Sequence, residues 1–218
     1  MKFKNYLQKK LSSDAKQKIR KIGVNILNPI YRFNLGQLSD LYGSDKNYKH
    51  GYTDHYEMFF KGMRHKKIIL LEIGIGGYKD SKSGGASLRM WKKYFPKGTI
   101  NGIDIYDKSK IDENRINTFK CDQTDKKKLN EILIKIGYPD IIIDDGSHIN
   151  KHVIKSFTIL FPNLKNKGYY VIEDVHTSYR DGYGGNAKNL KEETTTMNYF
   201  KKLSDSINKK YINDNLFE

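Results

Sequence analysis

The sequence predicts a doubly wound α/β domain, in which helices cover both faces of a parallel sheet. From residue 67 to residue 174, short apolar runs alternate with segments that have helical spacing. Glycine or acidic residues follow directly after most of these runs. Parallel strands joined by helical crossovers give this pattern, and ligands of such sheets bind beyond the carboxyl ends of the strands.

Each expected strand is an apolar run bounded by turn residues, and each expected helix has its apolar residues on one side. In the first of these helices, Leu88, Trp91 and Phe95 recur at helical spacing, and Gly137 is expected to end the second. The expected strands are 67–74, 99–106, 115–122, 139–146 and 168–174, and the expected helices are 86–95, 126–137 and 148–164.

Residues 1–60 are predicted to form a helical arm and a cap, which precede the sheet domain of residues 61–218. The arm, residues 1–33, is basic and amphipathic, and Pro29 is expected to end it. The rest of this region mixes aromatic residues, histidine and glycine, so it can lie over a ligand cleft or cap the core. The apolar positions of the arm are Phe3, Leu7, Leu11, Ile19, Ile22 and Ile26.

The bulk composition limits the class of protein. A chain of 218 residues, 37% of them hydrophobic, suits one packed domain. It has no apolar run of about 18 residues that could span a membrane, and its N-terminus lacks the apolar stretch of a secretory signal. The single cysteine, Cys121, excludes an intramolecular disulfide and favours a reducing compartment. We therefore expect a cytoplasmic protein.

The formal net charge of +15 could favour anionic partners such as nucleic acid. The lysines, however, are scattered along the whole chain, as is typical of solvated surfaces. The charge alone therefore does not predict nucleic-acid binding.

The first three predicted strands end in residues that suit a nucleoside ligand. The first strand runs into the turn EIGIGG (72–77), where glycines let the backbone approach a ligand closely. An acid ends the second strand and could accept both ribose hydroxyls, and polar groups after the third could contact an adenine edge. A tight structural turn also explains the glycines, and the pattern does not separate a dinucleotide from S-adenosylmethionine. The candidate residues are Glu72, Gly74, Gly76, Asp104, Asp122 and Gln123.

Acidic residues collect after the fourth and fifth predicted strands. Asp145 follows the fourth strand within Asp-Asp-Gly-Ser-His, and Glu173 and Asp174 follow the fifth. Neighbouring carboxylates repel one another unless a cation neutralises them, and such oxygen ligands suit Mg²⁺. His148 would lie beside such an ion as a general base. In the alternative interpretation these acids cap helix N-termini and His148 is simply exposed.

Several blocks of the chain resemble the metal-dependent O-methyltransferases of the macrocin and mycinamicin type. Members of that family methylate sugar hydroxyls on macrolide antibiotics, and relatives occur in surface-polysaccharide gene clusters. The resemblance extends from about residue 35 to about residue 185 and therefore covers most of the chain. It depends on LSDLYGSDKNYKHGYTDHYE, LEIGIGG, SGGASLRMWKKYFPKGTINGIDIYDKS and IIIDDGSHINKHVIKSFTILFPNLKNKGYYVIEDVHTSY.

The resemblance implies a Rossmann-like class I fold that binds S-adenosylmethionine and a divalent metal ion. The metal ligands would be Asp145, Glu173 and Asp174, and His148 would deprotonate the acceptor hydroxyl. The acceptor would be a sugar or a glycan-type molecule.

The same resemblance assigns the turn at 72–77 and Asp104 to the cofactor. The ribose would lie on Asp104, and the methionine part would lie near the turn. Segment 42–56 would correspond to the part that closes over cofactor and substrate.

The sequence departs from this family in its expected strands. A complete class I sheet has seven strands, of which the last two form an antiparallel hairpin, but here the pattern predicts five. An open sheet edge invites pairing with a second chain, so we expect a homo-oligomer or a helix within residues 198–216 that covers the edge. In that helix Phe200, Leu203 and Ile207 have helical spacing.

Two alternative functions remain open at this point. A nucleic-acid methyltransferase would account for the charge, but it usually carries an Asn/Asp-Pro-Pro-aromatic block where this chain has Asp-Asp-Gly-Ser-His. A non-catalytic cofactor-binding module would account for the short C-terminal region.

Overall fold

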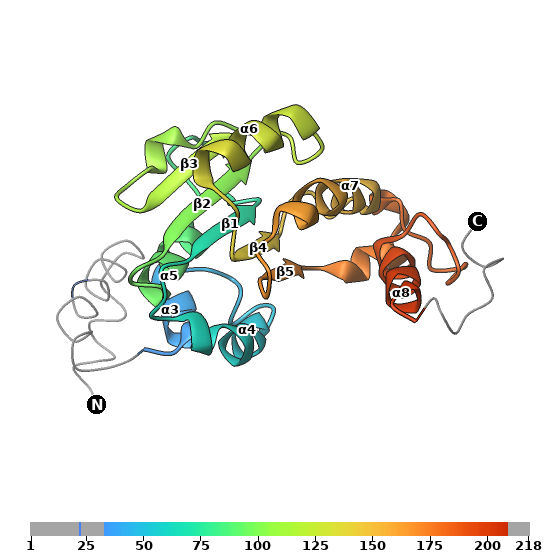
Figure 1. Ribbon diagram of the computed structural model, residues 1–218, viewed down its shortest axis with the longest axis horizontal. Coiled ribbons are helices and arrows are strands. Elements are labelled where there is room, and N and C mark those ends of the chain that lie inside the picture. Colours follow the sequence, from blue (N-terminus) through green and yellow to red (C-terminus); the bar gives the residue numbers. More distant parts are fainter. Residues whose placement is uncertain (1–21, 23–32, 209–218) are drawn as a thin grey trace, which may run out of the picture.

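The computed structural model describes residue 22 and residues 33–208. Within these residues, five parallel strands form one sheet in the order β3-β2-β1-β4-β5 (Figure 1). The doubly wound class predicted from the sequence is therefore confirmed. The strands are β1 (Ile69–Ile73), β2 (Thr99–Asp104), β3 (Ile116–Lys120), β4 (Ile141–Asp144) and β5 (Tyr169–Ile172).

Helices pack on both faces of the sheet. They are α3 (Leu35–Tyr42), α4 (Tyr52–Phe60), α5 (Ala86–Tyr94), α6 (Lys126–Ile136) and α7 (Asn150–Leu160), and a further helix, α8 (Thr196–Ser206), packs on α7. Successive strand residues point to opposite faces: Leu70 joins a core with α3, α4 and α5, and Leu71 joins a second core with α6 and α7. The side chains that alternate along β1 therefore contribute to two hydrophobic cores, one on each face of the sheet.

The predicted cap shares the first of these cores with the sheet. Leu35 of α3 and Phe60 of α4 are fully buried in the same cluster as Leu70 and Trp91. A capping box starts α3, in which Asn34 and Gln37 exchange hydrogen bonds between side chain and backbone. The domain boundary at residue 60 stays a prediction, and the cap packs as part of the same core.

Several element ends differ from the sequence-based expectation for local reasons. Helix α7 was expected from residue 148, but His148 has a φ of 56°, which an α-helix cannot include, so the helix starts at Asn150. Its C-terminal end passes into a 3₁₀ turn, Phe161–Asn163, that contains Pro162. Beyond β5, Asp174 also has a left-handed φ, 53°, so the chain turns sharply after Glu173.

The predicted C-terminal helix forms as α8, while the part of it beyond residue 208 lies outside the described residues. Its Phe200 packs edge-on against Phe157 of α7, with ring centroids 4.8 Å apart. Leu203 and Ile207 are 38% and 82% exposed, so the expected apolar face is only partly buried. No strand follows β5 within residues 173–208, as the sequence predicts. The predicted N-terminal arm lies outside the described residues except for Ile22 and Phe33.

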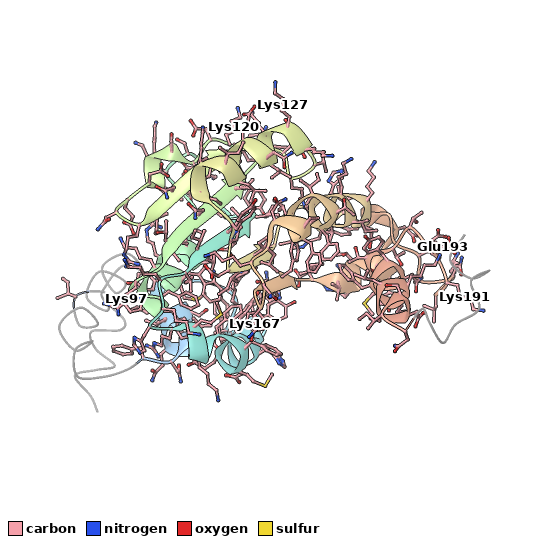
Figure 2. All side chains as sticks on the ribbon, viewed as in Figure 1. Lys97, Lys120, Lys127, Lys167, Lys191 and Glu193 are labelled. Carbon is pink, nitrogen blue, oxygen red and sulfur yellow. The ribbon has the colours of Figure 1, made fainter. Side chains whose placement is uncertain are left out.

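The surface of the described part carries dispersed lysines. Lys97, Lys120, Lys127 and Lys167 are exposed and lie far apart in the chain, in the turn before β2, at the end of β3, in α6 and in the turn before β5 (Figure 2). The predicted scattering of positive charge therefore holds for these residues. Among the described helices, none is both long and apolar enough to cross a membrane.

Candidate functional site

A cavity of about 770 Å³ opens at the carboxyl ends of β1 to β4. This is the edge at which ligands bind in open parallel sheets, and the volume lies within the range of small-molecule sites. The loop between α3 and α4, residues 43–51, contributes one wall. Predicted site residues that line the cavity are Gly74, Gly76, Asp104, Asp122, Gln123, Asp145 and His148.

Close backbone packing explains the glycines of the turn after β1. Gly74 has a φ of 79°, and a Cβ there would lie 2.1 Å from the carbonyl oxygen of Asp145. A Cβ on Gly77 would lie 2.3 Å from the carbonyl oxygen of Ser83. Gly76 has a φ of 72°, but a Cβ there would meet nothing within 4 Å. Glycine is therefore structurally required at positions 74 and 77. The turn also forms a wall of the cavity.

The polar groups after β2 and β3 face the cavity and are held by neighbouring backbone. Asp104 accepts hydrogen bonds from the backbone N–H of Ile75 at 3.3 Å and of Tyr106 at 2.9 Å. Asp122 accepts hydrogen bonds from the backbone and hydroxyl of Thr124, each at 2.8 Å. These contacts keep the carboxylates fixed at the edge of the cavity, and their predicted roles toward a cofactor stay predictions.

Gln123 links the ends of β3 and β4. Its Oε1 accepts a hydrogen bond from the Ser147 backbone at 2.8 Å, and its Nε2 donates to Asp144 at 3.3 Å. This side chain is only 7% exposed. Its amide groups therefore brace the loop that carries Asp145 and His148.

Glu72 lies outside the residues that line the cavity, although it was predicted to bind the cofactor. It is fully buried, and its Oε2 accepts a hydrogen bond from Trp91 Nε1 at 3.1 Å. Its Oε1 forms an ion pair with Lys46 Nζ, which lies 3.2 Å away. Burial raises the pKa of Glu72, while the Lys46 ammonium opposes that rise.

Asp145, His148 and Asp174 come together at the ends of β4 and β5. His148 Nε2 lies 3.7 Å from Asp145 Oδ1 and 3.8 Å from Asp174 Oδ2. One ligand atom from each residue lies within 4.8 Å of the others, which could accommodate a metal ion. The structure therefore brings together two of the predicted metal ligands and the predicted base.

The backbone at this cluster is strained. Both His148 and Asp174 are in the left-handed region, which side chains with a Cβ adopt at a cost of about 1–3 kcal/mol. Such strain persists where surrounding structure fixes it, and it concentrates at functional sites. His148 is 21% exposed as a side chain, so it is not a freely solvated surface histidine.

Glu173, the remaining predicted metal ligand, turns one oxygen away from this cluster. Its Oε1 accepts hydrogen bonds from Lys46 Nζ at 2.6 Å and from the Tyr56 hydroxyl. Burial raises the pKa of Glu173, and Lys46 opposes the rise. Glu173 is therefore held by the loop after α3 and by α4, and it is not part of the group formed by Asp145, His148 and Asp174.

No established family model matches the chain. It is 47% identical over 175 residues to the mycinamicin VI 2''-O-methyltransferase of Micromonospora griseorubida, covering 80% of this chain and 44% of that enzyme. It is 48% identical over 158 residues to the demethylmacrocin O-methyltransferase of Streptomyces fradiae, covering 72% and 40% of the two chains. The solved structure of the MycE methyltransferase with Mg and SAH superposes with a TM-score of 0.81 at 44% identity, covering 84% of this chain and 48% of that chain.

The chain belongs to the macrocin and mycinamicin family of sugar O-methyltransferases. The resemblance stated from the sequence is thereby confirmed. The chain spans less than half the length of the curated relatives it matches.

Sequence reasoning missed several residues that this macrocin-type fold brings to the carboxylates. Lys46 and Tyr56 reach Glu173, and the Tyr52 hydroxyl donates to Asp174 Oδ1 at 2.6 Å. Burial alone would raise the pKa of Asp174, but this hydrogen bond and the nearby histidines hold the pKa below its ordinary value. These residues lie in a block that carries the family resemblance, but nothing in the local pattern shows which distant groups they contact.

Asp144 is a buried carboxylate that helps to hold the loop after β4 in this macrocin-type fold. It is almost fully buried and accepts hydrogen bonds from Gln123, Ser156 and the backbone of Gly146. Burial raises the pKa of Asp144 to about 6 despite these donors. The pKa of Asp144 is higher in the folded protein than in the unfolded chain. Its contribution to the free energy of unfolding is therefore largest below about pH 4 and is lost as the pH rises through about 6.

Replacing Asp144 by asparagine should therefore stabilise the fold more at high pH than at low pH. Ser156 Oγ also lies 3.0 Å from the Val153 carbonyl, so it can donate there and accept from the new amide. We expect the gain in free energy of unfolding to be larger at about pH 8 than at about pH 5 by about 1–2 kcal/mol. Urea unfolding of both proteins at the two pH values measures this, and parallel pH profiles would contradict it.

Proposed function

We propose that the chain transfers the methyl group of S-adenosylmethionine to a hydroxyl of a sugar or glycan-type acceptor, with the help of a divalent metal ion such as Mg²⁺. The observation that carries this proposal is the position of His148 Nε2 between Asp145 and Asp174, on the wall of the cavity. The named activities of the relatives support the same reaction class.

The cavity fits the proposed cofactor. Gly76 leaves space beside the backbone of the turn 72–77, and the Asp104 carboxylate on the cavity wall would accept ribose hydroxyls. Asp122 and Gln123, on the neighbouring strand end, would flank the adenine. S-adenosylmethionine would supply the methyl group.

The donor set fits a hard divalent ion. Asp145, Glu173 and Asp174 offer carboxylate oxygens, which are the ligands that Mg²⁺ prefers. Buried or half-buried acids in this number need positive charge nearby. Bound there, such an ion would lower the pKa of the acceptor hydroxyl.

His148 is the proposed general base. Its Nε2 would accept the proton of the acceptor hydroxyl while the hydroxyl oxygen bonds to the methyl carbon and the bond from that carbon to the sulfonium sulfur breaks, which would leave S-adenosylhomocysteine. Asp145 and Asp174, both within 4 Å, would stabilise the resulting imidazolium.

The sequence and the structure also bear on nucleic-acid binding, cellular location and assembly. Methylation of nucleic acid is not favoured, because the exposed lysines of the described part are dispersed. A cytoplasmic location is proposed on the single cysteine. A homo-oligomer is also proposed, because the outer edge of β5 pairs with no strand among the described residues.

Titration calorimetry with S-adenosylhomocysteine, with and without MgCl₂, tests the cofactor assignment. Replacing Asp104 by alanine should weaken S-adenosylhomocysteine binding by about 1–3 kcal/mol, because charge-assisted hydrogen bonds to the ribose are lost. Asp107→Ala is the matched control, since Asp107 is exposed and outside the cavity lining. Equal affinity in both variants would contradict the assignment. A screen of nucleotide sugars with MgCl₂ or EDTA then tests methyl transfer itself.

A further inference from the structure

Lys46 is a buried cation that joins the ends of separate strands. Its side chain is 1% exposed, and Nζ lies 2.6 Å from Glu173 Oε1 and 2.8 Å from Asp145 Oδ2. The ammonium also lies 3.2 Å from Glu72 Oε1. Lys46 belongs to the loop 43–51, so a single side chain from this loop reaches the ends of β1, β4 and β5.

Two tyrosines of α4 approach the same carboxylates. Tyr52 and Tyr56 are four positions apart on a helix, so their side chains project from one face. The Tyr52 hydroxyl donates to Asp174 Oδ1 at 2.6 Å, and the Tyr56 hydroxyl donates to Glu173 Oε1. Together with Lys46, they form a set that we call the orienting triad.

The triad divides the oxygens of each carboxylate between two sides. Asp145 presents Oδ2 to Lys46 and Oδ1 toward His148. Asp174 presents Oδ1 to Tyr52 and Oδ2 toward His148. For Asp145 and Asp174, the oxygen that the triad leaves free is therefore the one on the His148 side.

Glu173 is also held by the triad, at its Oε1. That oxygen receives both Lys46 and Tyr56, and Oε2 takes part in neither contact. Each of these carboxylates thus has one oxygen committed to the triad and one outside it.

We propose that Lys46, Tyr52 and Tyr56 are positioning residues that aim one oxygen of Asp145, Glu173 and Asp174 at a divalent ion by holding the other oxygen. This inference rests on the proposed function and adds to it the residues that set the ion's affinity. A carboxylate on a free side chain loses rotational freedom when it binds an ion, whereas one already held by a donor loses less. Partners that orient metal ligands typically change metal affinity about 10–100-fold.

The single hydroxyl deletions Tyr52→Phe and Tyr56→Phe test this with the least change in volume. We expect each to weaken MnCl₂ and MgCl₂ binding about 10–100-fold by calorimetry, with S-adenosylhomocysteine affinity unchanged. The metal concentration for half-maximal methyl transfer should rise by a similar factor, while kcat at saturating metal stays near the wild-type value. A hydroxyl with a merely structural role would not produce this split.

Tyr94→Phe is the matched control. Tyr94 is fully buried and donates to Glu57 Oε1 at 3.1 Å, so it loses the same kind of hydrogen bond outside the cluster. Its metal affinity should equal that of the wild type. Lys46→Arg adds a further check, because it keeps N–H donors to the carboxylates and should therefore preserve more metal affinity than Lys46→Met.

The possible outcomes separate this inference from the proposed function. If the wild-type chain binds neither MnCl₂ nor MgCl₂, both are overturned. If it binds them and Tyr52→Phe and Tyr56→Phe bind equally well, the orienting role alone is overturned. A loss of kcat in these variants that saturating metal does not restore would also overturn it, as would an equal loss of affinity in Tyr94→Phe.

Discussion

Replacing His148 by alanine is expected to lower the rate of methyl transfer about 10²–10⁴-fold, the usual contribution of a general base. The imidazole lies near both Asp145 and Asp174 on the cavity wall. The methyl group of alanine cannot accept a proton there. Binding of S-adenosylhomocysteine should stay unchanged, and metal binding should stay largely intact. Initial rates with saturating cofactor and metal measure the loss.

The backbone at residue 148 requires a second variant. Alanine is strained at a φ of 56°, whereas asparagine adopts the left-handed region more readily. His148→Asn should therefore lose turnover to a similar extent with less effect on folding. His176→Ala is a useful comparison, because this ring lies 3.9 Å from Asp174 but is about half exposed. Near-normal turnover of His148→Ala between about pH 6 and 9 would show that His148 is not the base.

Replacing Gly74 by alanine is expected to destabilise the fold by about 2–5 kcal/mol and to abolish cofactor binding. The added Cβ would lie 2.1 Å from the Asp145 carbonyl oxygen and 2.8 Å from Gly146 Cα, both of them backbone atoms. The loop that carries Asp145 would have to move away from β1. Urea unfolding and S-adenosylhomocysteine titration measure the two effects.

Gly76→Ala separates steric overlap from backbone strain. Gly76 has nearly the same positive φ, but a Cβ there meets nothing within 4 Å. Gly76→Ala should lower the free energy of unfolding only through backbone strain, by about 1–2 kcal/mol. Equal destabilisation by Gly74→Ala and Gly76→Ala would mean that the contact between the turn and the Asp145 loop does not matter.

The sheet and the meeting of Asp145 with Asp174 could be predicted because both depend on short-range patterns. Apolar periodicity marks the strands, and the carboxyl ends of neighbouring parallel strands lie at one edge. The sequence cannot show that Lys46 reaches Glu173, which is 127 positions away, or that Tyr52 reaches Asp174, 122 positions away. Such contacts depend on how α3 and α4 pack on the sheet.

The orientation of individual groups was also beyond the sequence. Glu72 was predicted as a cofactor ligand from its place before the glycines; that role stays a prediction, and the sequence does not show that Trp91 and Lys46 hold this side chain outside the cavity lining. The late start of α7 depends on the left-handed backbone at His148, which tertiary contacts impose against local preference.

The buried contacts that hold the loop 43–51 affect how ligands enter and leave the cavity. Swinging this loop outward would pull the Lys46 ammonium out of a buried cluster of carboxylates, and breaking a buried pair costs about 3–5 kcal/mol. The helices on either side of it are anchored by fully buried Leu35 and Phe60. The loop therefore forms a wall that is closed at rest, and any opening of segment 42–56, which the family resemblance implies closes over cofactor and substrate, would have to separate Lys46 from these carboxylates.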